Sequence, residues 1–130
     1  MHDILIIDDE SKLLEVLQKV LEREGYTVLT SSSGEEGIKI FKKMQPKLVI
    51  TDILMPDMDG IELIENIKQE NDSQKIIIMS GGSRNLAADF VLTLGVGFGG
   101  DATLTKPFSI EDLIEAVVGI IGTAAKRDDI

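Results

Sequence analysis

Short runs of aliphatic residues recur along this chain, separated by stretches with helical periodicity. Residues 4–7 and 76–79 are continuous apolar runs rich in isoleucine, and residues 48–51 are three aliphatic residues and a threonine, as expected for strands covered on both faces. Residues 11–24 and 60–70 instead place apolar side chains three and four positions apart, which is the spacing of an amphipathic helix. Strands that alternate with helices predict a parallel sheet with helices on both faces.

The alternation continues to the end of the chain, and right-handed crossovers leave few possible topologies. We expect the flavodoxin-like (βα)5 fold, a doubly wound α/β sheet with strand order 2-1-3-4-5. One domain would occupy residues 1–121, and residues 122–130 would form a tail or the start of a linker. The expected strands are residues 4–7, 26–30, 48–51, 76–79 and 103–105, and the expected helices are 11–24, 33–44, 60–70, 85–94 and 109–121.

Local sequence signals support the helix boundaries. Ser33 with Glu36, and Ser109 with Asp112, have the spacing of capping boxes at helix N-termini. Gly25 is expected to end the first helix. The second strand is more polar than the others, so we place it nearer an edge of the sheet. In the last helix Ile110, Leu113, Ile114, Val117 and Val118 are expected to face the core.

Chemically useful side chains follow four of the predicted strands. Asp8 and Asp9 end the first, Asp52 the third, Ser80 the fourth and Lys106 the fifth. In open α/β sheets ligands bind at the carboxyl ends of the strands. The order 2-1-3-4-5 makes the first and third strands neighbours, so the three aspartates should converge in one pocket.

Three carboxylates in one pocket repel each other. Two unit charges ~4 Å apart cost about 4 kcal/mol at an effective dielectric constant near 20. A bound cation removes this repulsion, and oxygen ligands without histidine or cysteine favour a hard ion. We expect Mg²⁺, for which Mn²⁺ should substitute. Asp52 could then attack phosphorus to form an aspartyl phosphate, while Lys106 neutralises the transferring oxygens and Ser80 donates a hydrogen bond to one of them.

Composition narrows the location and the partners. The chain has 130 residues and no cysteine, so disulfides and thiolate metal sites are excluded. Its net charge of −10 disfavours binding to nucleic acid or anionic membranes. No apolar run approaches the ~18 residues of a membrane span, and the N-terminus lacks the pattern of a signal peptide. We therefore expect a cytoplasmic protein.

Four motifs together resemble the response-regulator receiver domain of two-component signalling, similar in scale to the stand-alone chemotaxis regulator. They are Ile-Leu-Ile-Ile-Asp-Asp-Glu at residues 4–10, Asp-Ile-Leu-Met-Pro-Asp-Met-Asp-Gly at 52–60, Ser-Gly at 80–81 and Lys-Pro-Phe at 106–108. The resemblance implies that a histidine kinase or histidine phosphotransfer protein donates a phosphoryl group to Asp52.

The same resemblance implies specific roles at the site. Asp9 and Asp52 would bind Mg²⁺ directly, Asp8 through water, and the backbone carbonyl of Leu54 would add a ligand. Lys106 would pair with Asp52 or its phosphate, and the peptide bond from Lys106 to proline would be cis. Glu10 is expected to face solvent beside the pocket, and Asp57 and Asp59 are expected to be turn residues.

Two departures from the family concern output. Thr103 occupies the position where the family usually has tyrosine or phenylalanine, so a switch based on a rotating ring is not expected. Residues 95–100 contain four glycines, and we expect a mobile loop there. By resemblance, the output surface would be the fourth helix, fifth strand and fifth helix. With no DNA-binding or catalytic segment after Ile121, we expect output through binding of a downstream protein.

Other functions remain as alternatives. A Mg²⁺-dependent aspartyl phosphatase or phosphotransferase usually needs a second acid two residues after its nucleophile, where this chain has Leu54. A flavodoxin-like electron carrier would place flavin phosphate where Asp8 and Asp9 repel it. An interaction module that works without phosphorylation would not need the complete set of site residues. We expect self-catalysed phosphorylation and dephosphorylation, not an enzyme with an external substrate.

Overall fold

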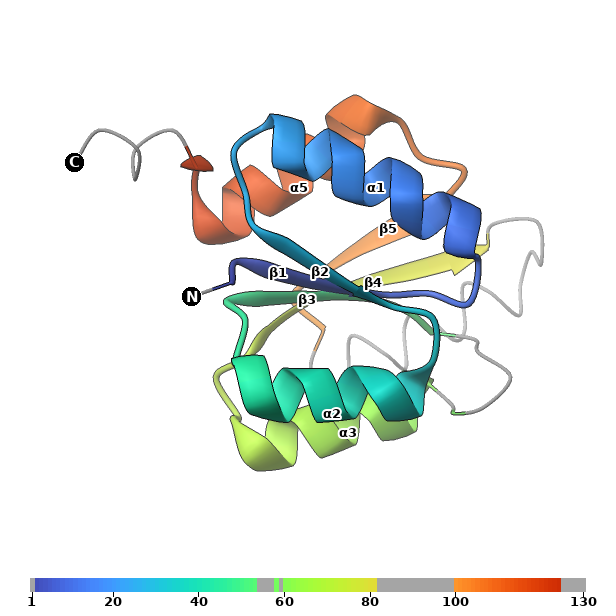
Figure 1. Cartoon of the computed structure of the whole chain (residues 1–130), viewed down its shortest axis with the longest axis vertical. Helices are drawn as coiled ribbons and strands as arrows, with labels where there is room; N and C mark the ends of the chain where they lie inside the picture. The colour runs from blue at the N-terminus through green and yellow to red at the C-terminus, as the bar shows by residue number, and fades with distance from the viewer. Residues whose placement is uncertain (1, 54–57, 59, 82–99, 125–130) are drawn as a thin grey trace.

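A computed structural model of the chain describes residues 2–53, 58, 60–81 and 100–124. Figure 1 shows a central sheet with α1 and α5 on one face and α2 and α3 on the other. The strands are β1 (Ile4–Ile7), β2 (Val28–Ser31), β3 (Leu48–Asp52), β4 (Lys75–Gly81) and β5 (Ala102–Lys106). The helices are α1 (Ser11–Arg23), α2 (Gly34–Met44), α3 (Gly60–Glu70) and α5 (Ile110–Ile121).

All five strands are parallel and have the order β2-β1-β3-β4-β5. The predicted topology is therefore confirmed, and the more polar strand β2 does lie at an edge. The register aligns Ile7 of β1 with Thr51 of β3, and Asp52 with Met79 of β4. As a result, the polar residues that follow these strands meet at one edge of the sheet.

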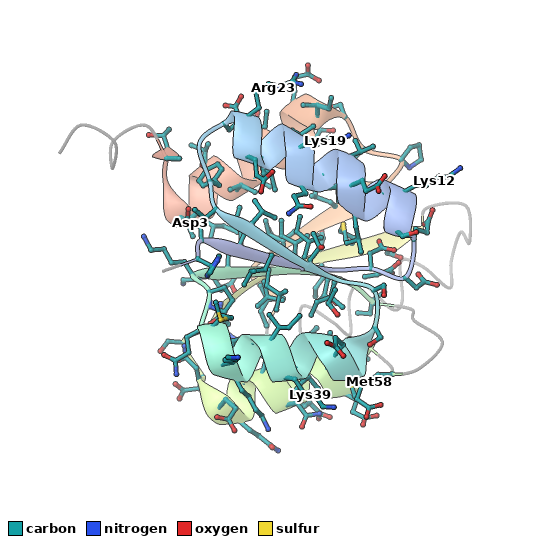
Figure 2. The ribbon with its side chains drawn as sticks, in the orientation of Figure 1. Asp3, Lys12, Lys19, Arg23, Lys39 and Met58 are labelled. Carbon is teal, nitrogen blue, oxygen red and sulfur yellow. The ribbon has the colours of Figure 1, made fainter. Side chains whose placement is uncertain are left out.

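The strand residues alternate between two aliphatic cores. Ile4 and Ile6 of β1 pack toward α1 and α5, whereas Leu5 and Ile7 pack toward α2 and α3. Burial on both faces explains why the central strands are uninterrupted apolar sequences. Figure 2 shows side chains filling both layers, while the labelled Lys12 and Lys39 project away from the sheet.

The predicted local signals for the helix ends are present. The Ser33 hydroxyl accepts a hydrogen bond from the Glu36 backbone N–H at 3.1 Å, and the Ser109 hydroxyl accepts one from that of Asp112 at 3.0 Å. Gly25 follows α1 with φ of 99°, a left-handed conformation that glycine adopts without steric cost. Among the helices that the structure describes, none is long and apolar enough to cross a membrane.

Some sequence predictions need correction. Strand β2 begins at Val28, two residues later than predicted, and α1 ends one residue earlier, at Arg23. Ile110 is 51% exposed in the first turn of α5, so its predicted place in the core is wrong. Only Leu113 and Val117 of the five predicted α5 core residues are buried; they lie four positions apart on one face of the helix, whereas Ile114 and Val118 are partly exposed. The predicted helix 85–94 and glycine-rich segment 95–99 lie outside the described residues.

Packing of the chain continues past α5. The Tyr26 hydroxyl donates a hydrogen bond to the Gly122 carbonyl at 2.6 Å, and Ala124 is buried in the core beneath α1 and α5. The predicted domain boundary at residue 121 stays a prediction.

Candidate functional site

Three aspartates converge where β1 and β3 end. Asp8 and Asp9 directly follow β1, and Asp52 is the last residue of β3. Each offers one carboxylate oxygen, and these oxygens all lie within 4.8 Å of one another. Asp8 and Asp52 are buried, whereas Asp9 is exposed. The convergence predicted from strand order is therefore confirmed.

Lys106 brings the counter-charge to this cluster from the end of β5. Its ammonium nitrogen lies 2.7 Å from Oδ2 of Asp8 and 3.0 Å from Oδ2 of Asp52. The following peptide bond, Lys106–Pro107, is cis as predicted. The two ion pairs show that Lys106 reaches from the edge strand β5 across β4 to the ends of β3 and β1.

The same contacts decide the protonation of Lys106. Burial alone would favour the neutral amine, but hydrogen bonds to Asp8 and Asp52, together with their charges, outweigh it. The pKa of Lys106 is therefore raised above its ordinary value. Its side chain carries a full positive charge at physiological pH and can neutralise a transferring phosphoryl group.

The donor atoms suit a hard divalent cation. Two oxygens on opposite sides of Mg²⁺ lie about 4.2 Å apart, because each Mg–O distance is about 2.1 Å. The three aspartate oxygens lie within 4.8 Å of one another, so a single cation could bind all three once the side chains adjust. One ammonium group does not balance the three carboxylates, and this leaves a charge that a cation would neutralise.

Ser80 lies in β4 beside this cluster. The register places its neighbour Met79 opposite Asp52, and Ser80 opposite Thr105 of β5. Its hydroxyl is fully buried and has no hydrogen-bond partner among the residues that the structure describes. Because an unpaired buried hydroxyl is costly, this group is suited to receive an oxygen acceptor brought into the site.

The contact between Glu10 and Lys106 was not predicted from the sequence. The side chain is exposed, as predicted, but its Oε1 lies 3.4 Å from Nζ of Lys106. Its backbone N–H also donates to Oδ1 of Asp8 at 2.9 Å. An acidic residue two positions after Asp8 was the available signal, but the approach of Lys106 depends on how β5 ends.

The remaining residues named in the sequence analysis are not part of the aspartate cluster or lie outside the described residues. Thr103 is exposed on the edge strand β5, and no aromatic side chain occupies its position. Leu54, Asp57 and Asp59 lie outside the described residues, so the predicted carbonyl ligand stays a prediction. Met58 is described, is half-buried and packs against the core under α2 and α3.

Residues 4–118 match the family described as the response regulator receiver domain. The chain belongs to this family. The matched span begins at β1 and ends within α5, so it contains every residue of the carboxylate cluster as well as Ser80 and Lys106. The resemblance inferred from the four sequence motifs is therefore confirmed.

Known receivers resemble this one in sequence and in structure. The "Alkaline phosphatase synthesis transcriptional regulatory protein PhoP" of Bacillus subtilis is 35% identical over 118 residues, which cover 91% of this chain and 48% of that protein. This receiver spans about half the length of the curated relatives it matches. The activities of those longer proteins are therefore not transferred to it.

Two solved structures are similar over almost the whole chain. A receiver domain from Clostridium thermocellum has a TM-score of 0.84 and 32% identity, with all of both chains covered. A CheY-like receiver domain from Methanospirillum hungatei has a TM-score of 0.83 and 30% identity, with 92% of each chain covered. The fold, the acidic cluster and Lys106 thus place this receiver in two-component signalling, whose receivers interact with histidine kinases. Acidic clusters of this kind are typical of Mg²⁺-binding receiver sites, and receivers are not a classical enzyme family.

Proposed function

We propose that this receiver accepts a phosphoryl group on Asp52 from the phosphohistidine of a histidine kinase or phosphotransfer protein, and signals through changed binding of a protein partner. The observation that carries the proposal is the ammonium of Lys106, 3.0 Å from Asp52 and 2.7 Å from Asp8. A nucleophilic carboxylate, additional acids and a fixed cation thus lie within one small volume at the sheet edge.

The transfer exchanges one bond to phosphorus for another. A carboxylate oxygen of Asp52 forms a bond to phosphorus while the bond from phosphorus to the donor imidazole nitrogen breaks. Asp8 and Asp9, with Asp52, would hold Mg²⁺, which supplies positive charge against the phosphoryl oxygens when bound. Lys106 supplies a second cation, which already contacts two buried carboxylates before the reaction.

Ser80 would receive one of the phosphoryl oxygens. Its buried hydroxyl lies on the strand adjacent to that of Asp52, and a hydrogen bond to the new oxygen would draw the end of β4 toward the site. In this proposal Ser80 and the following backbone transmit modification, because Thr103 provides no ring to rotate. The backbone carbonyl of Leu54 would supply a further metal ligand, and Asp8 would act through water.

Output is proposed to use β5 and α5 together with the helix predicted at residues 85–94, which lies outside the described residues. The first turn of α5 carries the acidic residues Glu111 and Asp112, and Glu115 follows one turn later. A partner with a basic surface would complement this face. The negative net charge argues against direct contact with nucleic acid or an anionic membrane, and the cytoplasm stays the predicted location.

Intact mass spectrometry tests the proposal. The chain is incubated with Mg²⁺ and acetyl phosphate, alongside Asp52→Asn and the control Asp72→Asn, whose exposed side chain lies in the turn after α3. We expect a hydroxylamine-labile gain of about 80 Da, one phosphoryl group, in the wild type and the control but not in Asp52→Asn. No gain in any protein, together with no binding of beryllofluoride, would favour a phosphorylation-independent interaction module.

A further inference from the structure

Glu10 contacts the phosphorylation site from its solvent side. Its backbone N–H is bonded to Asp8 at 2.9 Å, and its carboxylate lies 3.4 Å from the ammonium of Lys106. The side chain is 65% exposed, whereas those of Asp8 and Asp52 are almost completely buried. Lys106 therefore has two rigidly held partners inside the site and one movable partner outside it.

The number of carboxylates around Lys106 equals the number of N–H donors on its ammonium group. Lysine has three N–H donors, and three carboxylates surround Nζ of Lys106 at distances of 2.7, 3.0 and 3.4 Å. Asp8 and Asp52 belong to the cluster that could hold a cation, but Glu10 does not. The longest and most exposed of the three contacts is thus the one that is not needed for the metal.

The groove beside Lys106 leaves space into which its ammonium could move if Glu10 did not contact it. Beside the site, a groove of about 480 Å³ runs between α1 and the start of α5, with Leu17 and Phe108 among its apolar lining residues. Glu10 and Lys106 both line this groove. The four-carbon stem of lysine is flexible, so a contact on the groove side restricts the directions that the ammonium can take.

Phosphorylation changes what Lys106 must bind. When Asp52 becomes an acyl phosphate, its carboxylate charge is lost and negative charge appears farther out, on the phosphoryl oxygens. The ammonium then has to shift outward, away from the buried Oδ2 of Asp52. Glu10 can follow because its side chain is long and exposed, whereas Asp8 is fixed by burial and by the Glu10 backbone.

We propose that Glu10 is a positioning residue for Lys106: it holds the ammonium toward Asp52 before phosphoryl transfer and stays with it when the charge moves outward. This inference rests on the proposed function of the site. Glu10 takes no part in bond making. Its removal would leave the fold and the acceptor intact but would let the ammonium sample unproductive directions.

The first test measures phosphorylation rate against acetyl phosphate concentration for Glu10→Ala, Glu10→Gln and the control Glu15→Ala, an exposed acid on α1. An exposed ion pair contributes about 0.2–1 kcal/mol, which corresponds to about 1.4- to 5-fold in rate, so we expect the saturating rate of Glu10→Ala to fall within this range. Glu10→Gln keeps an oxygen acceptor and should fall less. The control should match the wild type.

Two other results of this experiment would overturn the proposal. If Glu10 only repels the anionic donor, both Glu10 variants would reach half-saturation at lower acetyl phosphate with an unchanged saturating rate. If Glu10 is merely a solvated surface acid, both variants would match Glu15→Ala throughout.

The second test does not require phosphorylation. NMR of the lysine ammonium groups reports how fast the protons of Lys106 exchange with water in the unmodified protein. We expect slow exchange in the wild type and in Glu15→Ala, and faster exchange in Glu10→Ala. Equal exchange in all three would contradict the positioning role. If exchange responds as expected but no protein gains a phosphoryl group, the proposed function fails while the contact of Glu10 with Lys106 stands.

Discussion

Asp8 and Lys106, which are 98 residues apart in the sequence, form the shortest ion pair among the described residues, at 2.7 Å. Asp8 is fully buried at the end of β1, and Lys106 reaches it from the end of β5. The pair therefore spans the sheet edge across β4 and β3 and places the ammonium beside Asp52. Removing one partner of a buried pair is costly, because the other charge remains without compensation.

Lys106→Met tests this pair. The substitution keeps an unbranched side chain that is one atom shorter but removes the charge, leaving Asp8 buried among other carboxylates. We expect the free energy of unfolding in EDTA to fall by about 3 kcal/mol. Mg²⁺ should recover more stability in the variant than in the wild type, because it replaces the missing positive charge. Urea unfolding with and without Mg²⁺ measures both effects.

Lys42→Met is the matched control. Lys42 is half exposed and lies 3.8 Å from Glu70, so its pair should contribute less than about 1 kcal/mol. Similar losses in the two variants would show that burial of the Lys106 pair does not matter to stability.

Mg²⁺ should stabilise the wild-type protein through the three aspartates. For a site with a dissociation constant of about 1 mM, 10 mM Mg²⁺ would raise the free energy of unfolding by about 1.4 kcal/mol. Asp9→Asn and Asp52→Asn should lose most of this increment because each removes a charged ligand oxygen. Thermal unfolding at several Mg²⁺ concentrations provides the measurement. An increment that survives both substitutions would place the cation elsewhere.

Gly60 allows α3 to begin close to the end of β3. A Cβ at this position would lie 2.4 Å from Cα of Ile53, and the Gly60 N–H donates to the Ile53 carbonyl at 2.9 Å. Since the obstructing atoms are backbone, Gly60→Ala should destabilise the protein by about 3 kcal/mol and slow phosphorylation of the adjacent Asp52. Chemical unfolding and the acetyl phosphate assay measure these losses.

Gly119 provides the contrasting substitution. A Cβ there would meet nothing within 4 Å, and alanine favours the helical conformation of α5. Gly119→Ala should stabilise the protein by about 0.5–1 kcal/mol and leave phosphorylation unchanged. If both alanines had the same effect, the close approach of Gly60 to Ile53 would not be a structural requirement.

Ser80→Ala should separate stability from function. The Ser80 hydroxyl has no partner among the described residues, so its removal should be neutral or stabilising by up to about 1 kcal/mol. Phosphorylation should nevertheless slow, because one donor to the phosphoryl oxygens is lost. Urea unfolding tests the expected effect on stability, and the rate of phosphorylation by acetyl phosphate tests the expected effect on function. A clear loss of stability would mean that the hydroxyl is already bonded in the unmodified protein.

Most of the fold was predictable because its determinants are local or repeat along the chain. The cap at Ser33 needs only Glu36 three residues later. The convergence of Asp8 with Asp52 needs only the strand order, because parallel strands end at the same edge.

Features that depend on side-chain direction were not predictable. Ile110 fits the apolar spacing of α5, but it is exposed and lines the groove beside α1 and not the core. The contact of Glu10 with Lys106 requires two long side chains from distant segments to meet. The hydrogen bond from Tyr26 to Gly122 likewise depends on where α5 ends relative to β2.

The most direct measurement locates the phosphoryl group on the chain. Borohydride reduction of the protein treated with Mg²⁺ and acetyl phosphate converts an aspartyl phosphate to homoserine, which tandem mass spectrometry can assign to one position. We predict homoserine at position 52 and at no other aspartate. Homoserine at Asp8, Asp9, Asp57 or Asp59, with Asp52 unmodified, would contradict the assignment of Asp52 as the phosphoryl acceptor.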